Sequence, residues 1–188
     1  MLLSVVKFGS PVLRKKGERI GEITPAIRRL IADMFETMYA YKGIGLAAQQ
    51  VGLPLQLTVL DVRGVTDRPS TLHIAGHPVE VHTFMPLVLI NPEITPVGPP
   101  VSGPEGCLSF PEIFADITRP DVVEVTAWDG EGQPLAFRCG GLLARAIQHE
   151  TDHLHGILFI DRMTRETKEQ LRPELDALQA ATKAETRR

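Results

Sequence analysis

Residues 140–156 read GGLLARAIQHETDHLHG and predict one helix with glycine at both ends. Apolar side chains recur on contiguous turns from Leu142 to Leu154, and a glycine after such a pattern is a typical helix stop. His149 and His153 are four residues apart, so on a helix their rings lie one above the other and can reach a single cation. This segment therefore predicts a helix that carries part of a metal site.

Glu150 follows the first histidine, where it can act as a general base toward water. Two histidines four apart could also occur by chance on a solvated helix face. The neighbouring Ala146, Ile147 and Leu154 oppose that explanation, because they place the histidines beside the buried face, where a charged glutamate needs a function. His155 lies on a different side of the helix and is not expected to join the site.

A catalytic metal site usually has three protein ligands and one open position. Cys107 is the stronger candidate for the third ligand, because EGCLSFP at residues 105–111 predicts an extended, tightly turned segment from which a thiolate can project. A single cysteine is more often a small buried hydrophobe than a ligand. The carboxylates downstream of the helix are weaker candidates: Asp161, Glu166 and Glu169.

Residues 43–50 read GIGLAAQQ and follow the expected end of a helix. The glycine spacing differs from that of a dinucleotide site, and no strand precedes it, so the simplest interpretation is a helix stop and a tight turn. Small residues do let a backbone approach a ligand closely. The amide of Gln50 could then donate to an oxyanion that develops during a reaction.

The composition excludes several classes of protein. The chain has 188 residues, 43% hydrophobic and 23% charged, which is typical of one soluble globular domain and argues against disorder. The net charge of −3 provides no general basic surface for nucleic acid. Apolar runs are too short to cross a bilayer, so no membrane partner is expected. Two cysteines do not make a disulfide scaffold, and the cytoplasm is the expected location.

Short strands clustered between helices predict an α+β fold, in which small antiparallel or mixed sheets pack around the HExxH helix. The expected helices are 25–42, 142–154 and a charged C-terminal helix from residue 164, which Pro173 would kink or restart. The expected strands are 5–8, 56–62, 87–91, 122–128, 135–138 and 157–160. We expect a catalytic domain at residues 1–163 and a charged helical tail at residues 164–188.

Residues 64–86 resemble an insertion and predict a surface hairpin, with strands at 71–74 and 79–84 and a turn at 76–78. The segment contains His73, His77 and His82. We expect these to be solvated loop histidines and not a second metal site.

Three motifs occur in a fixed order: GIGLAAxQ at 43–50, EGCLS at 105–109 and QHExDH at 148–153. Together they resemble the signature motifs of the peptide deformylase family. The similarity continues through residues 11–14, 33–39 and 158–162, and covers essentially the whole chain to Arg162. The resemblance implies a metal-dependent hydrolase that removes the N-formyl group from the N-terminal formyl-methionine of newly made polypeptides and releases formate.

The resemblance also implies which residues hold the metal. Cys107, His149 and His153 would be the ligands of one divalent ion, and Glu150 would be the general base. The ion implied for the cell is ferrous iron, while zinc, nickel and cobalt accept the same ligands and could occupy a purified sample.

Further roles follow from the same resemblance. Gln50 and the backbone N–H of Leu108 would form the oxyanion hole. The formyl-methionyl nascent peptide would pair, in extended form, with main chain at Ile44-Gly45 and Glu105-Gly106. The pocket for the methionine side chain would be lined by Ile44, Leu142 and Ala146.

Two other functions stay open from the residues alone. Cys107 could be the nucleophile of a cysteine hydrolase with a histidine base, which would stay active without metal. A Cys-His-His site could instead only stabilise the fold, although Glu150 argues against this because a structural site needs no base. The charged tail could dock on the ribosome or could be a simple solvated helix, and the second is the simpler interpretation.

Some predictions concern residues around the motifs. Asp152 is expected either to pair with Arg119 and so support the site or to be a simple surface carboxylate. Arg145 is expected to be an exposed helix residue or the partner of a carboxylate, and Cys139 an inert thiol. Phe114 stands where some deformylases carry a basic residue, so no electrostatic grip on the substrate is expected from this position.

Overall fold

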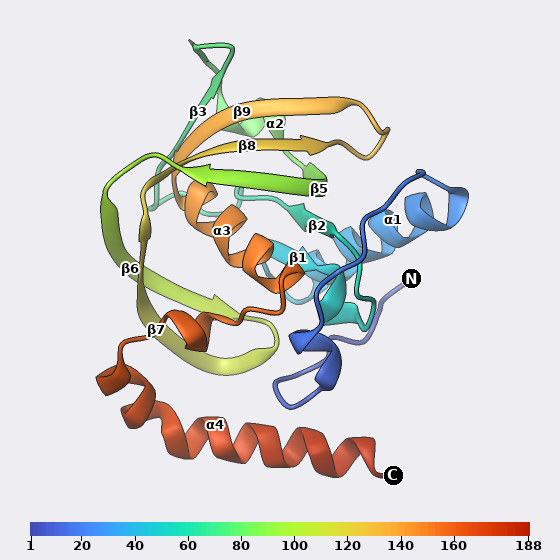
Figure 1. Ribbon diagram of the computed structural model, residues 1–188, viewed down its shortest axis with the longest axis vertical. Helices are drawn as coiled ribbons and strands as arrows, with labels where there is room; N and C mark the ends of the chain where they lie inside the picture. Colours follow the sequence, from blue (N-terminus) through green and yellow to red (C-terminus); the bar gives the residue numbers. More distant parts are fainter.

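Antiparallel strand pairing arranges the chain around the helix α3 (Leu142–Leu154), which runs through the middle of the molecule (Figure 1). The computed structural model describes all residues, 1–188. A seven-stranded sheet has the order β1-β2-β5-β8-β9-β3-β4, and β6 (Pro100–Cys107) and β7 (Phe110–Pro120) form a separate two-stranded sheet. The strands of the larger sheet are β1 (Gly45–Ala47), β2 (Leu57–Leu60), β3 (Ser70–Ile74), β4 (His77–Pro78), β5 (Leu87–Pro96), β8 (Val122–Trp128) and β9 (Pro134–Gly141). The fold is α+β, as predicted.

Helix α3 is buried on nearly every side, because the larger sheet covers one side of it and the β6–β7 hairpin another (Figure 1). All of its residues except Asp152 are buried. Gly141 turns the chain from β9 into α3 with φ of 69°, and a Cβ atom there would lie 2.2 Å from the carbonyl oxygen of Pro69. The backbone N–H of Leu142 donates to that same oxygen at 3.0 Å. The start of α3 is therefore tied to the segment that leads into β3.

Three apolar clusters form the core. The largest lies between the seven-stranded sheet and α3. A second lies under α1 (Pro25–Ala40), whose N-cap Thr24 accepts a hydrogen bond from the Ile27 N–H. The third joins β7 (Phe110–Pro120) to the C-terminal part of the chain.

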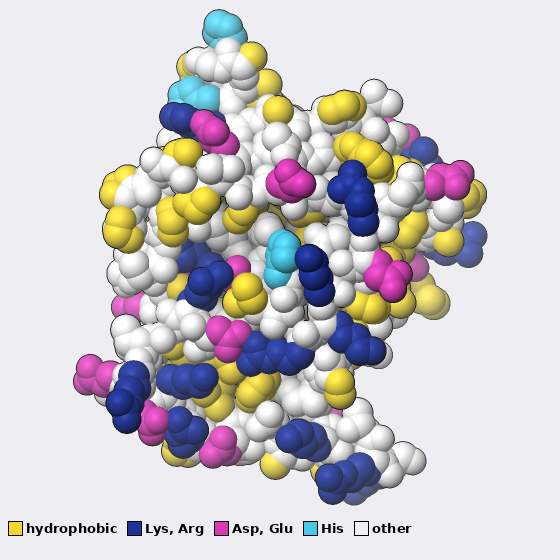
Figure 2. Space-filling model, viewed as in Figure 1, with side chains coloured by type: hydrophobic (Ala, Val, Ile, Leu, Met, Phe, Trp, Pro, Cys, Tyr) yellow, Lys and Arg dark blue, Asp and Glu magenta, His cyan; other side chains and the backbone are white.

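The C-terminal helix α4 (Arg165–Thr186) lies along the lower edge of the molecule. Pro173 lies inside it and does not divide it into two helices. Leu175 is buried in the third cluster, whereas charged side chains of both signs cover the outer face of α4 (Figure 2). None of the helices combines the length and the apolar character needed to span a bilayer.

Several element predictions were wrong in detail. Residues 5–8 are not a strand: the Val6 N–H donates to the carbonyl of Gln50 and the Phe8 N–H to that of Ser109, so the segment joins two other segments and does not pair with a strand. Residues 157–160 are not a strand either, because a 3₁₀ helix, η3 (Phe159–Arg162), forms there.

The 64–86 segment differs in part from the predicted hairpin. Its turn falls at Ala75-Gly76, one or two residues early, and residues 81–84 form the short helix α2 (Val81–Phe84). Strand β3 pairs with β9 and so extends the larger sheet. The hairpin of β6 (Pro100–Cys107) and β7 was not predicted as strands at all.

Candidate active site

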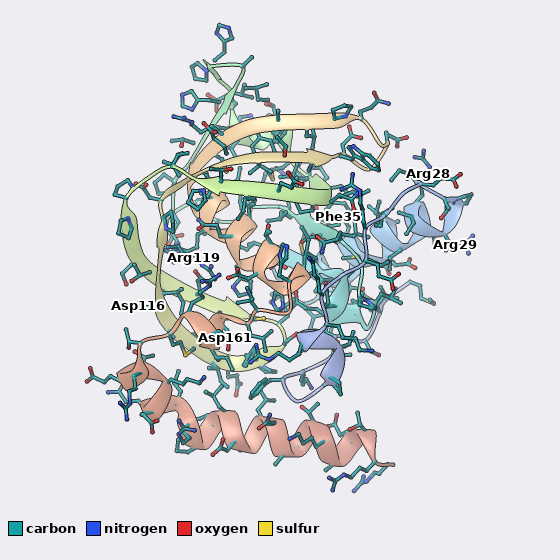
Figure 3. The ribbon with its side chains drawn as sticks, in the orientation of Figure 1. Arg28, Arg29, Phe35, Asp116, Arg119 and Asp161 are labelled. Atoms are coloured by element: carbon teal, nitrogen blue, oxygen red, sulfur yellow. The ribbon has the colours of Figure 1, made fainter.

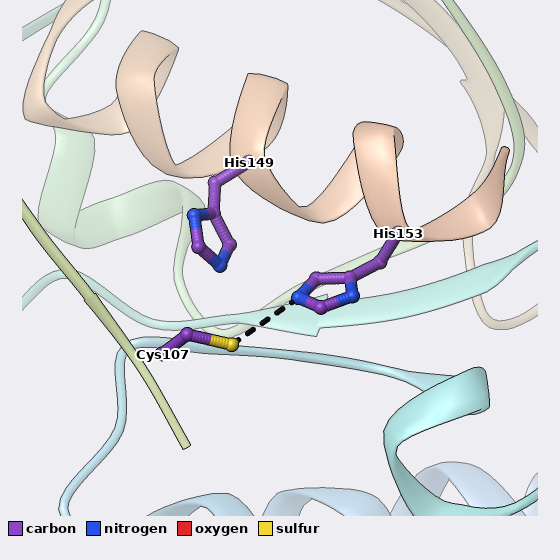
Figure 4. Close-up of side chains that lie close together, drawn as sticks. All are labelled: Cys107, His149 and His153. Atoms are coloured by element: carbon purple, nitrogen blue, oxygen red, sulfur yellow. Dashed lines mark hydrogen bonds between the residues drawn. The ribbon is translucent and has the colours of Figure 1, made fainter. Parts of the chain in front are cut away.

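The predicted ligands come together from two elements. Cys107 ends β6, and His149 and His153 lie one turn apart on α3, with one ligand atom of each within 4.8 Å of the others (Figure 4). The Cys107 sulfur lies 3.4 Å from Nε2 of His153. No other group of three or more His, Cys, Asp or Glu side chains in the protein is arranged to hold a metal.

Cys107 reaches α3 because the β6–β7 ladder is irregular at this point. Gly106 pairs with Phe114 and Cys107 with Phe110, so the register shifts within one residue of β6. A Cβ atom on Gly106 would lie 2.7 Å from the ring of Phe114, so glycine permits this close approach. The shift bends the end of β6 toward the helix.

Glu105 orients the first histidine. Its buried carboxylate is 2.9 Å from Nδ1 of His149, so this nitrogen donates to it and the other ring nitrogen is available as a ligand. Arg119 donates to the same carboxylate at 2.6 and 3.0 Å, and Arg145 at 2.9 Å. Burial alone would raise the pKa of Glu105, but the hydrogen bonds from His149 and Arg119 outweigh it and lower the pKa to about 2.

Arg119 extends this network along α3 (Figure 3). It donates to Asp152 at 2.9 Å, which confirms the predicted pair, and Arg162 binds the same carboxylate at 2.9 Å. Arg145 is buried and pairs with Glu105, so it is a carboxylate partner and not an exposed residue. The middle and the end of α3 are thus both held by ion pairs.

Gln50 lies beside the cysteine on the 3₁₀ helix η2 (Ala48–Val51). Its Oε1 accepts a hydrogen bond from the Ala47 N–H at 3.0 Å, which orients the amide group. Its Nε2 donates to the Ser109 hydroxyl at 3.2 Å and lies 3.5 Å from the Cys107 sulfur. The donor side of the amide therefore points toward Cys107 and Ser109.

Glu150 is buried and its Oε2 has no hydrogen-bond partner. Burial raises the pKa of this carboxyl to about 7, in the range that suits a group that accepts and returns a proton. Gly45 lies against it, and a Cβ atom there would be 2.7 Å from its Oε1. The glutamate is thus held close to the first motif.

The donor set fits a divalent transition metal. One thiolate and two imidazoles suit zinc and the neighbouring ions of the first transition row. The Nδ1 of His149 donates to the Glu105 carboxylate, an arrangement typical of ligating histidines. The Nδ1 of His153 is buried and has no hydrogen-bond partner. The residues present can therefore hold one ion.

A cleft of about 810 Å³ opens beside Cys107 and His149. All the predicted site residues line it except His153: Ile44, Gly45, Gln50, Glu105, Gly106, Cys107, Leu108, Leu142, Ala146, His149 and Glu150. The roles predicted for them stay predictions, since lining a cleft does not assign a function.

Some features of the site were missed or predicted differently. The resemblance assigned only the main chain of Glu105, whereas its side chain is the centre of the ion-pair network. Ser109, which binds Gln50, was not singled out. His77 and His82 are exposed and His73 is half-buried, and the absence of a second metal site at these residues stays a prediction. Burial raises the pKa of Cys139 to about 12, so it is a neutral thiol, as expected.

Comparison with known proteins gives consistent matches. A family model described as polypeptide deformylase matches residues 2–169. A peptide deformylase of Methylacidiphilum infernorum is 48% identical over 178 residues, covering 95% of this chain and 93% of the relative. A plant peptide deformylase, PDF1B, has a TM-score of 0.83 at 38% identity, covering 98% of this chain and 92% of that one. A peptide deformylase from Synechococcus elongatus in complex with actinonin has a TM-score of 0.77 at 39% identity, covering 92% and 85%.

The match extends over nearly the whole chain, so it concerns the fold as well as the motifs. The segments 43–50, 105–109 and 148–153, which carried the resemblance in the sequence, all contribute residues to the cleft. This chain belongs to the polypeptide deformylase family.

Proposed function

We propose that this protein hydrolyses the N-formyl group of formyl-methionyl nascent peptides and releases formate. One observation carries the proposal: Cys107, His149 and His153 lie together, and the first two of them line the same cleft as Glu150. A structural metal site needs neither a cleft nor a base, and the buried carboxylate of Glu150 supports a catalytic role.

We assign the metal to Cys107, His149 and His153, with ferrous iron as the ion expected in the cell and zinc, nickel or cobalt as substitutes. When bound, such an ion activates water and polarises a carbonyl oxygen. Glu150 is the residue that takes the proton from the attacking water and returns it to the departing amine. Its pKa of about 7 suits both transfers, because the carboxyl can then hold or release a proton near neutral pH.

The remaining roles belong to the peptide and the formyl group. Gln50 Nε2 and the Leu108 N–H donate to the formyl oxygen as negative charge develops on it. The formyl carbon carries only hydrogen, so a narrow site admits it and rejects larger acyl groups by steric clash. The peptide lies extended along Ile44-Gly45 and Glu105-Gly106, with its methionine side chain against Leu142 and Ala146.

Formate release from formyl-Met-Ala, by protein purified anaerobically with its metal quantified, tests this function directly. We expect Glu150→Ala to keep the metal and the fold but to lose activity, because it removes only the base. Gln50→Ala should lower kcat by about 10²–10³-fold, the usual cost of one oxyanion donor. Metal-loaded protein that releases no formate would contradict the proposal.

A chelator separates this mechanism from that of a cysteine hydrolase. Cys107 lies 3.4 Å from His153, a distance that would also suit a thiol and its base. We expect activity to disappear with the metal and to return when it is restored, whereas a thiol nucleophile would stay active. We also expect actinonin, which the Synechococcus deformylase binds in its crystal structure, to compete with the formyl peptide.

Docking of α4 on the ribosome stays a prediction from the charge of the tail. Its outer face carries side chains of both signs, as Figure 2 shows, which also suits a helix in contact only with water. Co-sedimentation of the full chain with ribosomes, at low and high salt, distinguishes the two.

A further inference from the structure

Three cations line the cleft without an acidic partner. Lys7, Lys42 and Arg68 all contribute to its wall, and none of them forms an ion pair. Arg145, the other basic residue of the wall, is bound to Glu105. The charges of the first three therefore remain available to a ligand in the cleft.

Main-chain hydrogen bonds hold the segments of the three cations in place. Lys7 lies between Val6, whose N–H donates to Gln50 at 2.8 Å, and Phe8, whose N–H donates to Ser109 at 2.9 Å. These bonds tie the residue to the first and second motifs. Its position beside the cleft is therefore set by main-chain hydrogen bonds and does not depend on its long side chain.

Lys42 and Arg68 are anchored in the same way. Lys42 has φ of 57° in the turn after α1, where its N–H donates to Tyr39 at 3.0 Å. Arg68 precedes Pro69, whose carbonyl accepts the N–H of Leu142 at 3.0 Å, so the start of α3 holds this part of the 64–86 segment. The three cations come from three separate segments and meet at one opening.

The acidic side chains of the cleft do not cancel this charge. Glu105 and Glu150 are buried, and the first is already paired with two arginines, so Glu112 is the single exposed carboxylate of the wall. Three free cations against this one anion leave the opening positive, on a chain whose net charge is −3. The opening thus has the opposite sign to the protein as a whole.

We propose that Lys7, Lys42 and Arg68 determine specificity by favouring formyl-methionyl peptides with acidic side chains in the first positions after methionine. This inference rests on the proposed deformylase function. Phe114, which is 70% exposed on the wall of the cleft, carries no charge and cannot attract an acidic side chain, whereas the three cations can. The cations act on binding, so the preference belongs to KM more than to kcat.

The test compares kcat/KM of the metal-loaded protein for formyl-Met-Ala-Asp-Asp, formyl-Met-Ala-Ala-Ala and formyl-Met-Ala-Lys-Lys. We expect the order acidic, neutral, basic, with about a 10-fold ratio between the first and the last at low salt. The ratio should fall toward one at about 0.5 M salt, where exposed charges are screened over a few ångströms.

Charge reversal identifies the residues responsible. Lys42→Glu combined with Arg68→Glu should invert the order, and Lys42→Gln combined with Arg68→Gln should flatten it if the first pair fails to fold. Lys183→Glu is the matched control, because it makes the same kind of charge change on α4, outside the cleft, and should leave the ratio unchanged.

Equal kcat/KM for the three peptides would overturn the inference while leaving the deformylase function intact. So would a preference that survives high salt, or one that Lys183→Glu changes as much as the variants of the opening do. If the metal-loaded protein releases formate from none of the peptides, the deformylase function itself is wrong, and the inference falls with it.

Discussion

Glu105 is the residue on which most of the site depends. It accepts hydrogen bonds from His149, Arg119 and Arg145 and is 7% exposed. A buried carboxylate with such partners is stabilising only while the set is complete, because the loss of one member leaves buried charge without compensation. Glu105 therefore both orients His149, a predicted metal ligand, and stabilises the fold.

Glu105→Gln should weaken both properties. We expect a metal affinity lower by about 10–100-fold, as is usual when the partner of a ligating histidine is changed. We also expect the free energy of unfolding to fall by about 3–5 kcal/mol, because two buried guanidinium groups lose their anion. Metal titration and urea unfolding measure the two effects. Glu124→Gln, in the half-exposed pair with Arg138, is the control and should cost less than about 1 kcal/mol.

Gly45→Ala tests how closely the first motif approaches Glu150, the proposed base. The added Cβ would lie 2.7 Å from Glu150 Oε1, so the carboxylate must move. Displacement of a catalytic group by about 1 Å can cost about 10²-fold in rate, and we expect kcat/KM to fall by that order. Gly21→Ala is the control, since a Cβ there meets nothing within 4 Å. Equal activities of the two variants would show that Glu150 is not constrained by this glycine.

At the scale of elements, α4 is joined to the rest of the protein by a narrow apolar stripe. Leu175 is its one buried leucine, packed in the cluster of β7 and η3, while Leu171 and Leu178 are half-buried beside it. These leucines pack against a cluster that includes Phe110, the residue directly after the motif at 105–109. The helix is therefore a support for the site as well as a charged surface.

Leu175→Ala should lower the free energy of unfolding by about 2–5 kcal/mol, the range for a buried leucine that leaves a cavity. Glu174→Ala, an exposed neighbour on the same helix, should change it by no more than about 0.5 kcal/mol. Urea unfolding of both variants gives the comparison. A loss for Leu175→Ala as small as that of the control would mean that α4 does not stabilise the remainder of the chain.

At the scale of the whole molecule, the N-terminal segment is bound to the segment after α3. Arg14 donates to Asp161 at 2.5 and 3.2 Å across 147 residues of sequence. Burial raises the pKa of Asp161, but the hydrogen bonds from Arg14 and the Leu158 N–H outweigh this effect. The pKa of the carboxyl in the folded protein is therefore lower than the usual 3.8. A carboxyl whose pKa is lower when folded stabilises the fold above its unfolded pKa and loses that contribution as the pH falls.

Asp161→Asn should therefore destabilise the protein at neutral pH and have a vanishing effect in acid. The difference in free energy of unfolding from the unmodified protein should shrink as the pH drops below about 4, because the unmodified carboxyl then becomes neutral as well. Urea unfolding at pH 7 and near pH 3 measures it. A difference that stays constant over this range would assign the effect to packing and not to charge.

Local patterns allowed much of the fold to be predicted. The bounds of α3 and the start of α1 follow from periodicity, capping and glycine, which act within a few residues. The β6–β7 hairpin was not predicted because the prolines and glycines at 100, 103, 104, 106 and 111 are residues typical of loops. Both strands of a two-stranded sheet are edge strands, and edge strands tolerate these residues. The apolar run at residues 157–160 has only four residues, which is too few for hydrophobic periodicity to distinguish a strand from a helical turn. The boundary at residue 163 stays a prediction.

The sequence by itself determined the three long helices, the histidine pair on one of them and, through its motifs, the family, and it predicted Cys107 as the third ligand. Only the tertiary structure decided that Glu105 holds His149 and that Lys7, Lys42 and Arg68 surround one opening. The reason is physical: periodicity and capping are properties of neighbouring residues, whereas these contacts join segments far apart in the chain. They exist only after the strands have paired and α3 is enclosed.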